Sequence, residues 1–206
     1  SLAQQKVIKN SLRDFKLYGV ALAPQAKQQY RKIQKSLSEL TSKFSENVLD
    51  ATQAWTRLVS EAESLAGVPE SSLAAMAEAA KSKDQQGYLI TLEFPSYFPI
   101  VTYCENRALR EEVYQAFVTR ASDQGPNAGS WDNSENIVEI LQQRLKLADL
   151  LGFKSYAEYS LATKMAESPK QVIDFLEELA GKGLSKAKEE FAEVQAYAIQ
   201  DRKSVV

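Results

Sequence analysis

The residues of this chain that could carry chemistry are few, and the absence of histidine restricts them most. The 206-residue sequence contains no histidine and a single cysteine, Cys104. A Ser-His-Asp triad, a Cys-His pair and a His-Glu-x-x-His zinc motif all require histidine, so the chain contains none of them. One cysteine cannot build a Cys-ligated zinc site or an intrachain disulfide. We therefore assign no catalytic, cofactor-binding or metal-binding residue to this chain.

Carboxylate pairs are the next groups that could act, as a general acid and a general base. Three such pairs occur: Glu111-Glu112, Glu177-Glu178 and Glu189-Glu190. Each lies in an amphipathic helical pattern, so the solvated face of a helix is the favoured interpretation. Cys104 has neither a base nor a strongly cationic pocket in view, and is predicted to be a small packing residue.

Two further features could serve binding. The run 94–99, Phe-Pro-Ser-Tyr-Phe-Pro, combines two prolines with three aromatic residues. The favoured interpretation is packing at the corner where a strand leads into a helix. Arg107, Arg110, Arg120 and Arg144 follow on the next helical segments. They form interhelical ion pairs or face a polar channel, and the sequence leaves both alternatives open.

Helical spacing dominates the segments that must position these residues. A helix is expected from about residue 3 to 18, with Gly19 where a helix C-terminal glycine belongs. A long helix from about residue 26 carries the apolar stripe Tyr30, Ile33, Leu37, Leu40, Phe44 and Val48. Steps of three and four residues are typical of one helix face. The first element is therefore predicted to be two antiparallel helices joined by a short turn.

A small β-ribbon is expected next. Segments 54–59 and 88–94 are rich in strand formers, and the second is bounded by Gly87 and Pro95. A helix over 71–81 separates them. The alternative to the first strand is that the long helix continues through Trp55.

The second half of the sequence is predicted to be helical apart from a loop at 121–131. We expect a short helix at 95–104, followed by an Asn106-capped helix that ends near residue 120. A third helix is started by Asp132 and Glu135 and has an apolar face at 137, 140, 141, 145, 148 and 151. A short Ser155-capped helix to about 163 and a last long helix opened by Ser168-Pro169 complete the chain. Gly152 ends the third of these, and Gly181 with Gly183 is expected to break or kink the last.

The predicted fold is mainly α, an antiparallel helical bundle-like domain with a small two-stranded β-ribbon. One domain is expected over 1–200, with 201–206 as a tail or cloning boundary. The first residue, Ser1, is not an initiator methionine, and the chain is expected to be a piece of a longer protein.

Composition narrows the partners. Lys+Arg number 25 against 27 Asp+Glu, a net charge of −2, which does not suggest a nucleic-acid partner. No apolar run approaches the roughly 18 residues of a membrane span, so no membrane partner is expected. A lone cysteine is typical of a reducing compartment, and a cytoplasmic location is predicted.

The order of segments resembles the N-terminal helical part of the thimet oligopeptidase family, the M3-type zinc metallopeptidases. The stretches that carry the resemblance span nearly all of residues 1–200: 44–52, 88–92, 95–99, 106–107, 109–111, 116–117, 119–121, Asn136, 139–141, Arg144, 150–153, 156–158, 165–166, 168–169, Val172 and 175–176. No single stretch is specific, but their number and order make coincidence improbable.

The resemblance implies a cytoplasmic parent enzyme that cleaves short peptides and signal-peptide remnants. It implies a clam-shaped, mostly helical protein with one zinc ion deep in a channel, held by a His-Glu-x-x-His helix and a downstream glutamate. That motif does not occur in this sequence, so no catalytic or zinc residue is carried over. The expectation is a non-catalytic channel wall that restricts access to short peptides and whose partner is the missing catalytic half.

Two further expectations concern partners. A dimer through apolar surface left exposed without that half is predicted for the chain alone. The rival to the whole interpretation is a free-standing helical interaction module that uses the Tyr30–Phe44 stripe as its seam.

Overall fold

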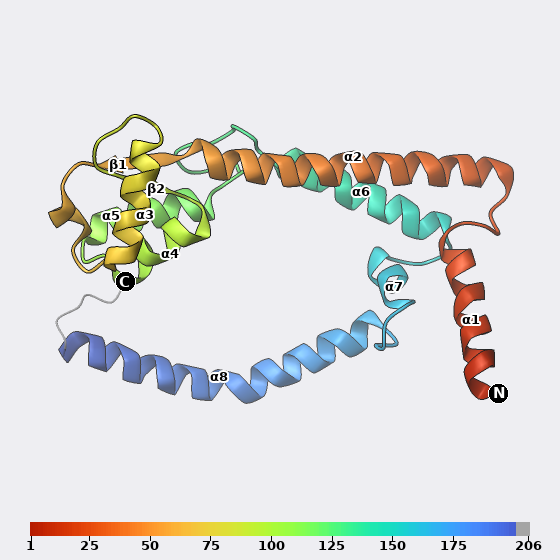
Figure 1. Ribbon diagram of the computed structural model, residues 1–206. Coiled ribbons are helices and arrows are strands. Elements are labelled where there is room, and N and C mark those ends of the chain that lie inside the picture. Colours follow the sequence, from red (N-terminus) through yellow and green to blue (C-terminus); the bar gives the residue numbers. More distant parts are fainter. Residues whose placement is uncertain (201–206) are drawn as a thin grey trace. The chain divides into compact units, whose positions relative to one another are not determined.

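The fold is mainly helical, with one small antiparallel sheet (Figure 1), as the sequence predicted. The structure is a computed structural model and describes residues 1–200, so the predicted tail at 201–206 lies outside the described residues. The elements in chain order are α1 (Leu2–Leu17), α2 (Pro24–Ala54), β1 (Thr56–Val59), the 3-10 turn η1 (Ala62–Leu65), α3 (Glu70–Lys81), β2 (Tyr88–Thr91), α4 (Phe94–Tyr103), α5 (Arg107–Val118), α6 (Ser134–Leu150), α7 (Tyr156–Leu161) and α8 (Pro169–Gln200).

The chain divides into two compact units. Within the described residues, the terminal unit combines Ser1–Lys27 with Leu145–Gln200, and the ribbon unit is Gln28–Arg144. Helices α2 and α6 each belong partly to both. The organisation of 1–200 as one domain stays a prediction.

The terminal unit is built from α1, the end of α6, α7 and α8. Ser1 caps α1 in a capping box with Gln4, and Gly19 follows the helix at φ 74°, as its predicted C-terminal position requires. Ser155 accepts a hydrogen bond from the Glu158 N–H and begins α7. The side chains of Leu12 and Leu17 share a groove with Leu151 and Phe153, which brings α1 close to the segment before α7.

The ribbon unit holds the hydrophobic core. Strands β1 and β2 pair antiparallel with Arg57 opposite Ile90 and Leu58 opposite Leu89. Helices α3 and α4 pack against β2. The buried cluster draws on both strands, η1, α3, α4 and α5: Trp55, Val59, Leu65, Val68, Met76, Ile90, Leu92, Ile100, Cys104, Leu109, Val113 and Ala116. This core fixes the edge of β1 relative to α5.

The first strand confirms the predicted ribbon over its alternative, because α2 ends at Ala54, before Trp55. The second strand is shorter than predicted, since α4 already begins at Phe94. Proline fits the first turn of a helix, where its missing N–H would have no partner. The backbone N–H of Thr91, the last residue of β2, donates to the Ser96 hydroxyl at 3.0 Å, which ties the end of the strand to α4.

Three expectations about the later helices need correction. The capping box predicted for Asp132 and Glu135 does not describe the start of α6, because the Asp132 carboxylate accepts from the Ser134 N–H and hydroxyl instead. The predicted apolar face of α6 is mixed, since Ile140 and Ala148 are buried but Ile137, Leu141 and Leu145 are exposed. Helix α8 runs unbroken from Pro169 to Gln200, so the predicted break is wrong, whereas the helix does bend along its length (Figure 1).

Candidate functional site

The predicted chemical residues are not brought together into one reactive centre in the described part of the chain. All six glutamates of the three carboxylate pairs are exposed. Glu178 pairs with Lys182 and Glu189 with Lys186 on the surface of α8. The structure therefore supports a solvated helix face at each pair.

Cys104 is a packing residue, as predicted. It is buried at the end of α4, and its thiol donates to the Ser64 carbonyl at 3.6 Å. Burial raises the pKa of the Cys104 thiol, against the lowering effects of a backbone hydrogen bond from Asn106 and of the nearby Arg110. A buried, protonated thiol is a poor nucleophile and a poor metal ligand.

The four arginines differ from one another in ways that the sequence alone does not separate. Arg107 is exposed and Arg144 is half-buried on α6. Arg110 donates to the Cys104 carbonyl. Arg120 donates to the Phe117 carbonyl at 2.8 Å and to the Thr52 hydroxyl of α2 at 2.9 Å. Arg110 and Arg120 thus satisfy backbone and hydroxyl acceptors.

Arg120 lies against a pair of stacked aromatic rings. Its guanidinium carbon lies 3.7 Å from the centre of the Phe117 ring, a cation–π contact, and the Tyr97 ring stacks on Phe117 with centroids 3.8 Å apart. Burial raises the pKa of Tyr97, helped by Tyr114 and opposed by Arg120. Burial also lowers the pKa of Arg120. Phe94 and Phe98 stack on each other at 5.1 Å, so the run 94–99 forms an aromatic corner at the start of α4, as predicted.

Asparagines that sequence reasoning missed join α2 to α6 within the ribbon unit. The Asn133 Oδ1 accepts from Asn47 Nδ2 at 2.9 Å and from Asn136 Nδ2 at 3.0 Å. Asn133 Nδ2 donates to the Phe44 carbonyl, and Asn136 Nδ2 to the Leu40 carbonyl. These hydrogen bonds hold the first turn of α6 against the Tyr30–Phe44 stripe of α2.

The other unexpected feature is a groove beside β1. Its volume is about 470 Å³, within the range of ligand pockets. It is lined by Arg57, Leu58, Val59, Ser60, Glu61, Ser64, Asn106, Ala108, Leu109 and Glu112. Arg57 Nε lies 3.4 Å from Glu112 Oε1 and forms an ion pair between β1 and α5 at its rim. No local sequence pattern predicts this ion pair, because the two residues are brought together only by the packing of α5 on the sheet.

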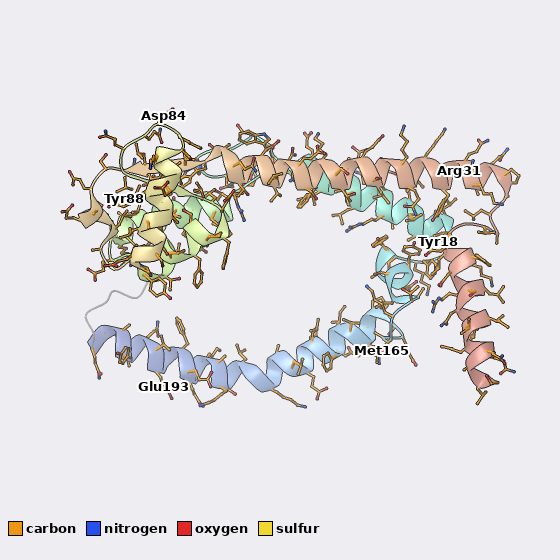
Figure 2. All side chains as sticks on the ribbon, viewed as in Figure 1. Tyr18, Arg31, Asp84, Tyr88, Met165 and Glu193 are labelled. Carbon is orange, nitrogen blue, oxygen red and sulfur yellow. The ribbon has the colours of Figure 1, made fainter. Side chains whose placement is uncertain are left out.

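The terminal unit presents a different surface. No residue of α8 is buried within the described chain, although the helix carries many large apolar side chains. Phe175 is 58% exposed and Tyr197 69%, and Glu193 marks the same helix in Figure 2. Just before α8, Met165 is 99% exposed and is also labelled there. Exposed large apolar side chains in such number are typical of a surface that meets another polypeptide.

Comparison with known proteins identifies the class. A family model described as peptidase family M3 matches residues 100–204. Oligopeptidase A of Haemophilus influenzae is 56% identical over 197 residues, covering 96% of this chain and 29% of that protein. Oligopeptidase A of Escherichia coli is 55% identical over 196 residues, 95% of this chain and 29% of that protein. A probable cytosolic oligopeptidase A of Arabidopsis thaliana is 39% identical over 205 residues, 96% of this chain and 28% of that protein.

The helical fold and these matches define a member of a peptidase family. The chain belongs to peptidase family M3. It spans less than a third of the length of the curated relatives it matches. No helix within residues 1–200 is long and apolar enough to cross a membrane.

The zinc ion that the family resemblance implies does not fit the residues that the structure describes. Within residues 1–200, no group of three His, Cys, Asp or Glu side chains could hold a metal ion. The sequence offers no imidazole, and its one thiol is buried and donates to a carbonyl. No catalytic step through a metal can be assigned to these residues.

Proposed function

We propose that this chain forms a non-catalytic helical segment of a zinc-dependent oligopeptidase that degrades short peptides, and that it builds part of the wall of the substrate channel. The observation that carries this proposal is the 55–56% identity to oligopeptidase A along 95–96% of the chain. Because the match covers only 29% of those proteins, the zinc-binding and catalytic residues are proposed to lie in the part that it leaves out.

The wall acts by exclusion and positioning. Its helices are held by a buried core and by side-chain hydrogen bonds such as Arg120 to Thr52 and Asn133 to Asn47, which support a rigid surface. A rigid wall restricts the channel to short, unfolded peptides and orients their backbones toward the catalytic half, where a zinc ion would activate water for hydrolysis.

The missing catalytic half is the proposed partner of α8. Its exposed apolar residues support this assignment: Ile173, Phe175, Leu176, Leu179, Leu184, Phe191, Val194, Tyr197 and Ile199. Burying apolar surface is favourable by about 25 cal/mol per Å², so such a helix gains stability when a second surface covers it. In the isolated chain the same surface supports self-association.

The rival, a free-standing interaction module, needs the Tyr30–Phe44 stripe to be open. The backbone carbonyls of Leu40 and Phe44 already accept hydrogen bonds from Asn136 and Asn133 of α6. The stripe residues from Ile33 to Leu40 are half-buried. This occupancy favours the oligopeptidase proposal. Capture of a specific stoichiometric partner other than the catalytic half would favour the module.

A cytoplasmic location is proposed for the longer protein. The Arabidopsis relative is named a probable cytosolic oligopeptidase A, and the single cysteine suits a reducing compartment.

A peptidase assay of the purified chain tests its non-catalytic character. With added zinc and a quenched fluorescent peptide, hydrolysis is expected to equal that of a sample without protein. Turnover above that level, removed by a zinc chelator, would contradict the proposal.

A further inference from the structure

The two outer edges of the β-ribbon differ in a way that points to a ligand. In an antiparallel pair, alternate residues direct both N–H and C=O toward the partner strand, and the others direct both groups away. The Thr91 N–H bonds to the Ser96 hydroxyl of α4 rather than to Thr56, its register partner. Thr56 and Thr91 are therefore a pair whose backbone groups point outward.

The register then determines which of the remaining ribbon residues direct their backbone groups toward the partner strand and which direct them away. The alternation then assigns the ladder hydrogen bonds to the pairs Arg57–Ile90 and Val59–Tyr88, and it directs the N–H and C=O of Leu58 away from β2. The position of Val59 supports this phase, because a Cβ on Gly87, next to Tyr88, would lie only 2.5 Å from the Val59 carbonyl oxygen. The Val59 carbonyl thus faces the β2 side of the ribbon.

The outer edge of β1 borders a groove, whereas on β2 the Thr91 N–H is bonded to Ser96 of α4 and Leu89 is buried. Leu58 has no backbone hydrogen bond outside the ribbon within residues 1–200, and it lines the groove of about 470 Å³ beside β1. A strand edge with free N–H and C=O groups in a groove is a template for another strand. Its chemical complement is the backbone of an extended polypeptide.

We infer that the groove between β1 and α5 is a peptide-binding subsite, in which a short extended peptide adds as a strand along Leu58 and Ser60. The groove wall opposite the strand edge consists of Ala108 and Glu112 on one face of α5. The inference deepens the proposed function by naming a substrate-binding element, and it rests on that function only for the source of the peptide.

Charged residues at the rim of the groove predict which peptide side chains bind better. Arg57 is paired with Glu112, whereas Glu61 has no cationic partner among the described residues. A peptide with a lysine or arginine that reaches Glu61 is therefore favoured over one with a glutamate at that position.

The test is a titration of the isotopically labelled chain with one probe, the acetylated and amidated pentapeptide Thr-Val-Lys-Val-Thr, followed by amide NMR. Shifts are expected at residues 56–61 and in the first half of α5. Replacing the probe's lysine by glutamate should weaken binding, and N-methylation of its three central amides should abolish it. No shifts at millimolar peptide, or shifts confined to α8, would overturn the inference.

Two matched proline variants test whether the peptide binds to the outer backbone edge of β1. Leu58→Pro removes the outward N–H inside the groove, and Thr56→Pro removes one outside it; both positions point away from the ladder, where proline is tolerated. Leu58→Pro is expected to weaken binding at least about tenfold, while Thr56→Pro and Leu58→Ala leave it within about threefold. Equal binding by the Leu58→Pro variant would overturn the inference.

A failure of the peptide-binding subsite can be distinguished from a failure of the proposed function. Peptide binding at β1 in a chain that cannot complete an active oligopeptidase would leave the subsite standing and remove the proposed function. Activity in the completed enzyme without binding at β1 would remove the subsite alone.

Discussion

At the scale of single residues, three asparagines carry the joint between α2 and α6. Asn133 is only 2% exposed, and it serves two amide donors and one carbonyl acceptor at once. Asn136 is also buried, and its Oδ1 has no hydrogen-bond partner among the described residues. A buried amide oxygen without a partner costs about 1–3 kcal/mol, so the joint is less stable than a fully satisfied network would be.

Asn133→Ala should lower the free energy of unfolding by about 2–3 kcal/mol, because it leaves Asn47, Asn136 and the Phe44 carbonyl short of a partner. Urea denaturation followed by circular dichroism measures the change. Gln142→Ala, on the exposed surface of the same helix, is the control and should stay within about 0.5 kcal/mol. An Asn133→Ala variant as stable as this control would contradict the role given to Asn133.

Asp132 gives a pH-dependent prediction. Hydrogen bonds from the Ser134 hydroxyl and N–H hold the pKa of Asp132 below its usual range. Because the folded pKa is lowered, the stabilisation is fully present above the unfolded pKa and is lost as the pH falls through the folded one. Ser134→Ala should raise the Asp132 midpoint in a carboxyl NMR titration, and Ser134→Thr should keep it low. An unchanged midpoint in Ser134→Ala would show that the hydroxyl has no part in the shift.

At the scale of elements, helix ends were predictable where the signal is local. Asn106 and Ser155 cap their helices with their own side chains, and Gly152 follows α6 at φ 82°. The end of β2 was not predictable in this way, since it depends on where α4 begins, and that helix already starts at Phe94. The groove beside β1 and the asparagine joint also escaped prediction, because residues far apart in the sequence meet there.

The glycines of α8 allow a test at this scale. A Cβ at Gly181 or Gly183 would meet nothing within 4 Å, and alanine is more favourable than glycine in a helix by about 1 kcal/mol. Gly181→Ala with Gly183→Ala should therefore slow hydrogen exchange across α8. Gly152→Ala is the opposite control, since its φ of 82° is strained for alanine and the variant should be less stable.

Faster exchange in the α8 double variant would contradict this prediction. It would mean that a close contact with the helix requires glycine at one or both positions.

At the scale of the whole molecule, the exposed apolar face of α8 predicts self-association of the isolated chain. Light scattering at increasing concentration should show a dimer in equilibrium with the monomer. Leu176→Glu with Leu179→Glu should shift the equilibrium to the monomer, because it places charge in the apolar face. Lys182→Ser, at an exposed position that pairs with Glu178, is the control and should leave association unchanged. A strictly monomeric wild-type chain at high concentration would count against the prediction.

Membership of a peptidase family is compatible with a sequence that contains no histidine. Family M3 is shown by the match over 100–204, while the residues present offer no zinc ligand set in the described chain. The chain's proposed contribution is a surface that excludes, positions and, at β1, binds peptides. Catalysis is proposed to require the part of the longer protein that lies outside the matched 29%.

The most direct test of this central claim is a chimera of Escherichia coli oligopeptidase A in which the matched segment is replaced by this chain. The chimera is expected to fold, to cleave short unfolded peptides and to lose this activity on zinc chelation. The same enzyme with the segment deleted should not cleave them. A folded chimera that retains its zinc but fails to cleave short peptides would contradict the claim that these residues form the channel wall of such an enzyme.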